Sequence, residues 1–109
     1  MTTSSSKYLS LFNGQTSNAT GGTVLYTARE QLALLYVNGN IGGGSLNIQI
    51  KPVVAAGYIT PTFDFVNLAG GSNLTEVEAK ALTIPAFCEV RAVLSGATSP
   101  NLDVGIFYQ

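Results

Sequence analysis

The strongest constraint on how this chain can fold is a repeated alternation of apolar and polar residues with a period of two. In the segment SLNIQIK (residues 45–51), Leu46, Ile48 and Ile50 occupy alternate positions and polar residues lie between them. The segments CEVRAVL (88–94) and LDVGIFY (102–108) repeat this pattern. Successive side chains of a β-strand point to opposite faces, so the alternation predicts strands with one buried and one exposed face.

Weaker versions of the pattern indicate further strands at residues 7–12, 23–28, 31–38, 59–66 and 75–84. About eight short strands separated by turn-forming residues are typical of an all-β, antiparallel β-sandwich, of which the jelly roll is one form. A length of 109 residues suits a single domain. We expect the sandwich at residues 23–109, preceded by a flexible N-terminal segment, residues 1–22, that contains a candidate first strand.

The segment SNLTEVEAKALTI (72–84) is the one place where a helix competes with a strand. Its glutamates, alanines and lysine are good helix formers. However, Val77, Ala79 and Ala81 alternate with charged residues, and this period of two favours a strand over a helix.

The segment VNGNIGGGSLNIQIKP (37–52) raises the question of a phosphate-binding loop. A glycine loop that holds phosphate leads into a helix, whose free N–H groups face the anion. Here the glycines at 42–44 lead into the alternating segment 45–51, which is expected to be a strand. Together with Asn38-Gly39 they favour positive backbone φ angles, which hairpin turns require. We therefore predict a hairpin turn and no phosphate site.

A second hairpin is expected at SGATSPN (95–101), between the last two strands. If the inward faces of those strands match, Val90 lies opposite Val104 and Cys88 lies opposite Ile106. The same register places Arg91 across from Asp103 on the outer face, where opposite charges would pair.

Charged residues make up only 10% of the chain, whereas ordinary soluble domains have about a quarter. The five basic residues are scattered, so nucleic acid is not expected as a partner. The longest strongly apolar run, residues 32–37, is too short to cross a membrane. The N-terminus MTTSSSK is not followed by the apolar stretch of a signal peptide, so we expect synthesis in the cytoplasm.

Few residues offer catalytic or metal-binding chemistry. Histidine, the commonest general base and metal ligand, is absent. Glu76 and Glu78 would share a strand face, but a solvated face is the simpler interpretation. Asp64 is expected to point to solvent, and Cys88, without a histidine to activate it, to be a small core residue. We therefore expect no enzyme activity, no cofactor and no metal site.

One strand is apolar on both faces. In LALLYV (32–37), the residues at even positions and the residues at odd positions are all apolar, so both faces of the strand are apolar. The last strand also places Phe107 on its outer face. A sandwich strand in a monomer usually has one polar face. Either another protein chain or a loop or helix of the same chain is expected to cover the second face. The candidate contact residues for a partner are Tyr8, Leu11, Phe12, Leu35, Val37 and Phe107.

Tyrosine side chains suggest a different candidate site. Small β-sandwiches bind sugar rings on exposed aromatic side chains, and this chain offers Tyr26, Tyr36, Tyr58 and Tyr108. Each of these is also explained as a core or rim residue.

The segments TVLYTA, LALLYVNGNIGGGSLNIQI and LTIPAFCEVRAVLSGATSPNLDVGIFY, within residues 23–109, resemble small β-sandwich virion proteins of tailed bacteriophages. The resemblance implies a capsid decoration (cement) protein that stabilises a phage head by binding across capsomers. It further implies a location in the virion, with the major capsid protein and other copies of the chain as partners. The alternatives are a carbohydrate-binding or receptor-binding module and a minor tail or fibre component.

Overall fold

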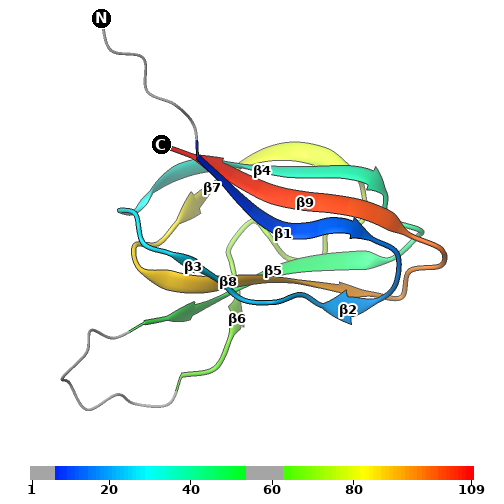
Figure 1. Cartoon of the computed structure of the whole chain (residues 1–109), viewed down its shortest axis with the longest axis horizontal. Helices are drawn as coiled ribbons and strands as arrows, with labels where there is room; N and C mark the ends of the chain where they lie inside the picture. Colours follow the sequence, from blue (N-terminus) through cyan, green and yellow to red (C-terminus); the bar gives the residue numbers. More distant parts are fainter. Residues whose placement is uncertain (1–6, 54–62) are drawn as a thin grey trace, which may run out of the picture.

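The structure, a computed structural model, describes residues 7–53 and 63–109. Within these residues the chain forms nine β-strands (Figure 1). The same residues contain no helix that is long and apolar enough to span a membrane. The strands are β1 (Lys7–Gln15), β2 (Ala19–Thr20), β3 (Val24–Tyr26), β4 (Gln31–Asn40), β5 (Ser45–Pro52), β6 (Val66–Asn67), β7 (Glu78–Ile84), β8 (Cys88–Ser95) and β9 (Asn101–Tyr108).

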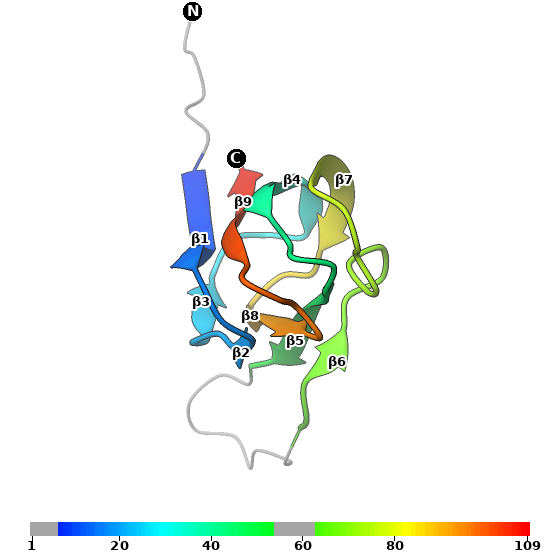
Figure 2. The same ribbon diagram turned by 90° about the vertical axis from the view of Figure 1, so that its right-hand side faces the viewer.

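The strands form two antiparallel sheets that pack face to face, as Figure 2 shows. Sheet A has the order β1-β9-β4-β7, and sheet B has the order β2-β8-β5-β6, with β3 also paired to β8. This is the strand order of a double-sheet jelly roll, in which two Greek keys wrap around one core. The predicted antiparallel β-sandwich is thus confirmed, and the strand chosen over a helix is β7.

The core lies between the sheets and is formed by the inward positions of each alternating strand. The alternation in β8 is complete, since Val90, Ala92 and Leu94 are buried while the residues between them are partly exposed. Leu46 and Ile48 of β5 and Val104 and Ile106 of β9 are also buried. Burying one such aliphatic side chain contributes about 1.5–3 kcal/mol, so this alternation dictates which face of each strand turns inward.

The predicted hairpin at residues 95–101 is wrong, because β8 and β9 belong to different sheets. Arg91 lies opposite Gln49 of β5, and Asp103 lies opposite Asn38 of β4. Asp103 instead accepts a hydrogen bond from the Gly14 N–H, at 2.7 Å. The alternation predicted the inward faces of β8 and β9 correctly but carried no information about their partner strands.

The expected pairs on the inner faces of those two strands are corrected in the same way. Val90 lies opposite Ile50 and Val24. Cys88 lies opposite Pro52 and Tyr26. In sheet A, the partners are those of β4 and β1: Val104 pairs with Val37 and Phe12, and Ile106 pairs with Leu35 and Leu9.

The hairpin predicted at the glycine-rich segment is also wrong, although the segment does form a turn. It connects β4 in sheet A to β5 in sheet B, and so it crosses from one layer to the other. Gly42 has a φ of 65°, and its carbonyl accepts a hydrogen bond from the Thr98 N–H at 2.9 Å. A β-carbon at Gly42 would lie 2.5 Å from the Thr98 carbonyl oxygen. The glycine therefore lets the two sheet-crossing connections touch at one end of the sandwich.

The N-terminal boundary of the sandwich also differs from the expectation. β1 begins at Lys7 and pairs with β9, and its residues Leu9, Leu11 and Phe12 are buried, so the sandwich begins before residue 23. β2 was not predicted, because two residues are too few to show a period. Of the strand expected at residues 59–66, residues 59–62 lie outside the described residues, and only Val66 belongs to a strand, β6.

Candidate functional site

The outer face of sheet A is the best candidate for a functional surface. On β4, Leu32 and Leu34 have 69% and 41% of their surface exposed, although both are leucines within a strand. Leu34 lies between Ala81 of β7 and Phe107 of β9, so the exposed apolar surface continues across three strands. We define the apolar face by its exposed residues Tyr8, Leu32, Leu34, Tyr36, Ala79, Ala81 and Phe107.

Three aromatic rings pack against one another on this face. The ring centroids of Tyr8 and Phe107 lie 4.7 Å apart, and those of Tyr36 and Phe107 lie 6.4 Å apart in an edge-on arrangement. Aromatic pairs of this kind contribute about 0.5–1.5 kcal/mol beyond the area that they bury. The rings thus hold one another in place and give the face a fixed shape.

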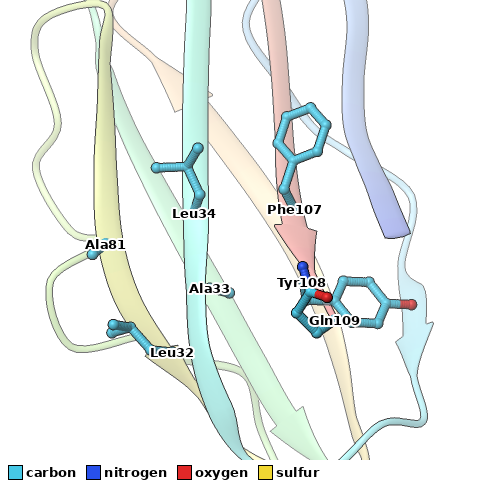
Figure 3. A pocket seen from close by; sticks show the side chains of 7 residues that line it. All are labelled: Leu32, Ala33, Leu34, Ala81, Phe107, Tyr108 and Gln109. Atoms are coloured by element: carbon cyan, nitrogen blue, oxygen red, sulfur yellow. The ribbon is translucent and has the colours of Figure 1, made fainter. Parts of the chain in front are cut away.

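Between β4 and β9 the apolar face is hollowed. Figure 3 shows Leu34 and Phe107 rising from neighbouring strands beside this hollow. The hollow has a volume of about 320 Å³ and is lined by Leu32, Ala33, Leu34, Ala81, Phe107, Tyr108 and Gln109. This volume is at the lower end of the range of small-molecule sites, and the lining is mainly apolar. Its chemistry suits an inserted apolar side chain and offers no acid, base or nucleophile pair.

The outer face of sheet B is more polar, although Leu25 of β3 is half-exposed there. The Arg91 Nε–H donates to Gln49 Oε1 at 2.9 Å, and the guanidinium lies 3.9 Å from the ring centroid of Phe65. Lys51 and Glu89 form an ion pair at 3.2 Å. These four polar side chains of sheet B therefore have partners within the chain, whereas the apolar face of sheet A leaves several apolar side chains in water.

The structure divides the six predicted contact residues into two groups. Tyr8 and Phe107 lie on the apolar face, where 49% and 36% of their surfaces are exposed. The other four belong to the core, which corrects their assignment to a contact surface: Leu11, Phe12, Leu35 and Val37. For β4 the cause is plain, since both of its faces are apolar and hydropathy alone does not say which one turns inward.

Leu32, Leu34 and Tyr36 are the contact candidates that the sequence analysis missed. The sequence after the apolar run indicates this face. Asn38 and Asn40 are polar, are exposed, and lie on the same face of β4 as Leu32, Leu34 and Tyr36. Extending the period by two residues would have identified this face as the outer one.

The alternative candidate, a sugar platform of tyrosines, is only partly on the surface. Tyr36 is exposed, but Tyr26 is buried, and its ring packs edge-on against Tyr108 at a centroid distance of 5.0 Å. The Tyr26 hydroxyl donates to the Arg29 carbonyl and accepts from Gln31 Nε2. Burial raises the pKa of Tyr26 above its ordinary value, although the hydrogen bond from Gln31 opposes this shift. Tyr58 lies outside the described residues.

Cys88 and Asp64 lie as the sequence predicted, but the two glutamates do not share a strand face. Cys88 is buried, and burial raises the pKa of its thiol above the ordinary value, so the thiol stays protonated at neutral pH. Asp64 is exposed. Glu78 lies in β7, but Glu76 precedes the strand. Within residues 7–53 and 63–109, no cluster of three or more acidic, histidine or cysteine side chains is arranged to hold a metal ion.

Comparisons of the chain with protein-family models, with curated proteins and with solved structures find no match. A functional assignment therefore rests on the surfaces described above.

Proposed function

We propose that the chain is a structural protein of a bacteriophage particle, a decoration protein that stabilises the head by binding across capsomers through the apolar face. The observation that carries the proposal is the apolar face itself. Contiguous exposed apolar surface on a small protein marks a contact site, because covering it removes apolar area from water. Side chains such as Leu32 and Leu34 have no structural reason to be exposed in a free monomer.

The fold and the composition support this proposal. Double-sheet jelly rolls occur in viral capsid proteins and in lectins, although a fold alone does not establish a function. The sequence resembles small virion proteins of tailed phages, and a net charge of −1 gives little repulsion between neighbouring copies. The outer face of sheet B is the more polar of the two, with its Arg91–Gln49 and Lys51–Glu89 contacts, and it suits exposure to solvent while sheet A is covered.

The mechanism follows from mass action. A protein that binds only the assembled shell lowers the free energy of that state and so opposes its disassembly. A site that spans two capsomers adds an avidity term, because detachment of one capsomer requires loss of both contacts. No bond is made or broken, so the mechanism needs no catalytic group.

The test begins with quantitative mass spectrometry of purified phage particles from the source of the chain. We expect a copy number close to that of the major capsid protein, or a simple fraction of it. A handful of copies per particle would point to the tail or a vertex, and complete absence would overturn the proposal.

Paired variants then test the surface. Leu34→Asp places a charge in the middle of the apolar face and should abolish incorporation into particles. Asn47→Asp adds the same charge to β5 of sheet B, where Asn47 is half-buried, and should leave incorporation unchanged. Circular dichroism of both purified variants establishes that the β-fold is kept. Equal incorporation of the two variants would contradict the use of the apolar face.

A carbohydrate-binding role is the second candidate, and it is favoured by the exposed rings of Tyr8, Tyr36 and Phe107 on one face. Sugar sites combine such rings with polar groups that hold hydroxyls. The cross-strand neighbours of Leu34 are Ala81 and Phe107, so protein contact suits this surface better. Titration of tyrosine fluorescence with a panel of glycans decides between them, because a bound sugar should change the emission of Tyr8 and Tyr36.

A further inference from the structure

The free edge of sheet A offers a second surface, which is separate from the apolar face. β7 is the last strand of sheet A, at the opposite edge from β1, as Figure 2 shows. Among the described residues β7 is paired with β4 only. Its outer edge therefore presents backbone N–H and C=O groups that another strand can pair with.

Two opposite charges lie along this edge. Glu78 and Lys80 occupy alternate positions of β7, opposite Val37 and Leu35 of β4, and both are half-exposed. The only ion pair within the described residues joins Lys51 to Glu89, so neither edge charge has an ion-pair partner in that part of the chain. Both side chains remain partly exposed, beside residues 72–76 of the same chain, with which they line a hollow.

We propose that β7 pairs antiparallel with β7 of a second copy of this chain, around a two-fold axis at Ala79. Ala79 then lies opposite its own copy, and Glu78 lies opposite Lys80 of the other molecule. By symmetry the second Lys80 meets the second Glu78. A two-fold contact uses the same surface on both molecules, so it must be complementary to itself, and this edge meets that condition.

The charges also select this register over its neighbours. Both copies turn the same face outward, so residues that lie opposite must belong to the same alternate set of positions. A centre at Lys80 would bring two lysines together. A centre at Ala81 would set Lys80 against Leu82 and Glu78 against Ile84. Only the centre at Ala79 gives each charge an opposite partner.

An inward-facing lysine on an edge strand normally blocks pairing, because the ammonium group would be forced against a second strand. Here Glu78 of the second copy removes that obstacle. The paired sheets would join the four strands of each copy into one sheet and place two apolar faces side by side. The inference depends on the free edge of β7 and its two charges, and it holds whether or not the apolar face binds a capsid.

Sedimentation velocity over a range of protein concentrations tests the proposal. The wild-type chain should form a dimer. Glu78→Lys and Lys80→Glu each bring like charges together and should raise the dimer dissociation constant at least about tenfold. The double variant Glu78→Lys with Lys80→Glu restores both pairs and should return the constant close to that of wild type.

Matched controls are Glu89→Lys and Lys51→Glu, which change the net charge equally but lie in sheet B, and they should leave the dimer intact. A wild-type chain that stays monomeric at every concentration would overturn the proposal. The proposal would also be overturned if the single variants lose the dimer and the double variant does not restore it, while circular dichroism shows that the variants are folded.

Cysteine cross-linking tests the register in a Cys88→Ala background. In the proposed pairing, the β-carbons of two residues 79 lie about 4.5–5.5 Å apart, which is close to the spacing of a disulfide. Two residues 81 are displaced by four positions along the strand, or about 13 Å. Ala79→Cys should therefore form a cross-linked dimer on mild oxidation, and Ala81→Cys should not. The reverse result would overturn the register.

Discussion

The ring of Tyr8 lies directly over Gly105, in the space that a β-carbon at that position would occupy. Tyr8 belongs to β1 and is paired with Phe107, two residues further along β9. The backbone of Gly105 does not have the positive φ that favours glycine. The glycine is therefore required by the ring above it, and the missing side chain lets Tyr8 lie across β9.

Gly105→Ala should destabilise the wild-type chain by about 1–3 kcal/mol, because the methyl group displaces the Tyr8 ring. In a Tyr8→Ala background the same substitution should be neutral or slightly stabilising, since alanine suits a strand better than glycine. Urea denaturation of the four proteins in this double-mutant cycle measures the difference. An equal cost in both backgrounds would show that the ring does not require the glycine.

Leu34→Ala and Leu35→Ala should differ sharply although they are neighbours in β4. Leu35 is fully buried in the core, and its truncation should lower the free energy of unfolding by about 2–5 kcal/mol. Leu34 is on the apolar face, and its truncation should cost less than about 1 kcal/mol. Denaturant midpoints compare the two directly. A larger loss for Leu34 would reverse the assignment of the inner and outer faces of β4.

Asn18 joins the loop after β1 to the connection between β8 and β9. Its Nδ2 donates to the Ala97 carbonyl at 3.0 Å, and its Oδ1 accepts from the Ala97 N–H at 2.8 Å. Asn18→Ala should cost about 1 kcal/mol, because water replaces both bonds only in part. Asn18→Asp should not restore this stability, because it keeps the acceptor but sets a carboxylate oxygen against the Ala97 carbonyl oxygen. Thr16→Ala, an exposed neighbour, is the control, and an equal loss of stability there would contradict a specific role for Asn18.

Stability should fall in alkali. Burial raises the pKa of Cys88 above its ordinary value of 9.0 and the pKa of Tyr26 above 10.0. At pH values above these ordinary values, the unfolded chain loses the protons while the folded chain keeps them. The stabilising contribution is therefore fully present below about pH 9 and is lost as pH rises through the folded pKa values. Thermal melting between pH 7 and 11 measures the fall.

The Cys88→Ala variant separates the two groups. It removes the thiol, so the stability of the fold should begin to decrease about one pH unit higher, where tyrosine starts to ionise. Tyr26→Phe in the same background should flatten the remaining slope at a cost in stability at neutral pH, because two hydrogen bonds to the hydroxyl are lost. An unchanged profile in both variants would assign the alkaline loss to other groups.

The sequence predicted the strands better than it predicted their neighbours. Alternation identified β5, β8 and β9 and the inward face of each, because burial of one face imposes that period. It did not identify the pairing, since adjacent strands such as β8 and β9 enter different sheets. Turn residues at 42–44 and 95–101 permit a sharp bend, but they do not distinguish a hairpin from a crossing between layers.

The sequence predicted that one face of residues 32–37 is apolar and exposed, but it did not predict which face. An apolar stripe on both faces of residues 32–37 indicated that one face needs cover, and the exposed Leu32 and Leu34 agree with this. The choice of Leu35 and Val37 failed because hydropathy is symmetric across such a strand. Only the packing of β4 against sheet B, or the exposed asparagines that follow, distinguishes the two faces.

The position of β9 in the middle of sheet A has a consequence for the order of folding. β9 lies between β1 and β4, and Lys7 pairs with Tyr108 at the far end of the chain. During synthesis β1 and β4 have no contact in this sheet until residues 101–108 have left the ribosome. Closing so long a loop is slow, and folds dominated by distant pairings take milliseconds to seconds. Sheet A should thus close only once residues 101–108 have emerged, in one cooperative step completed by β9.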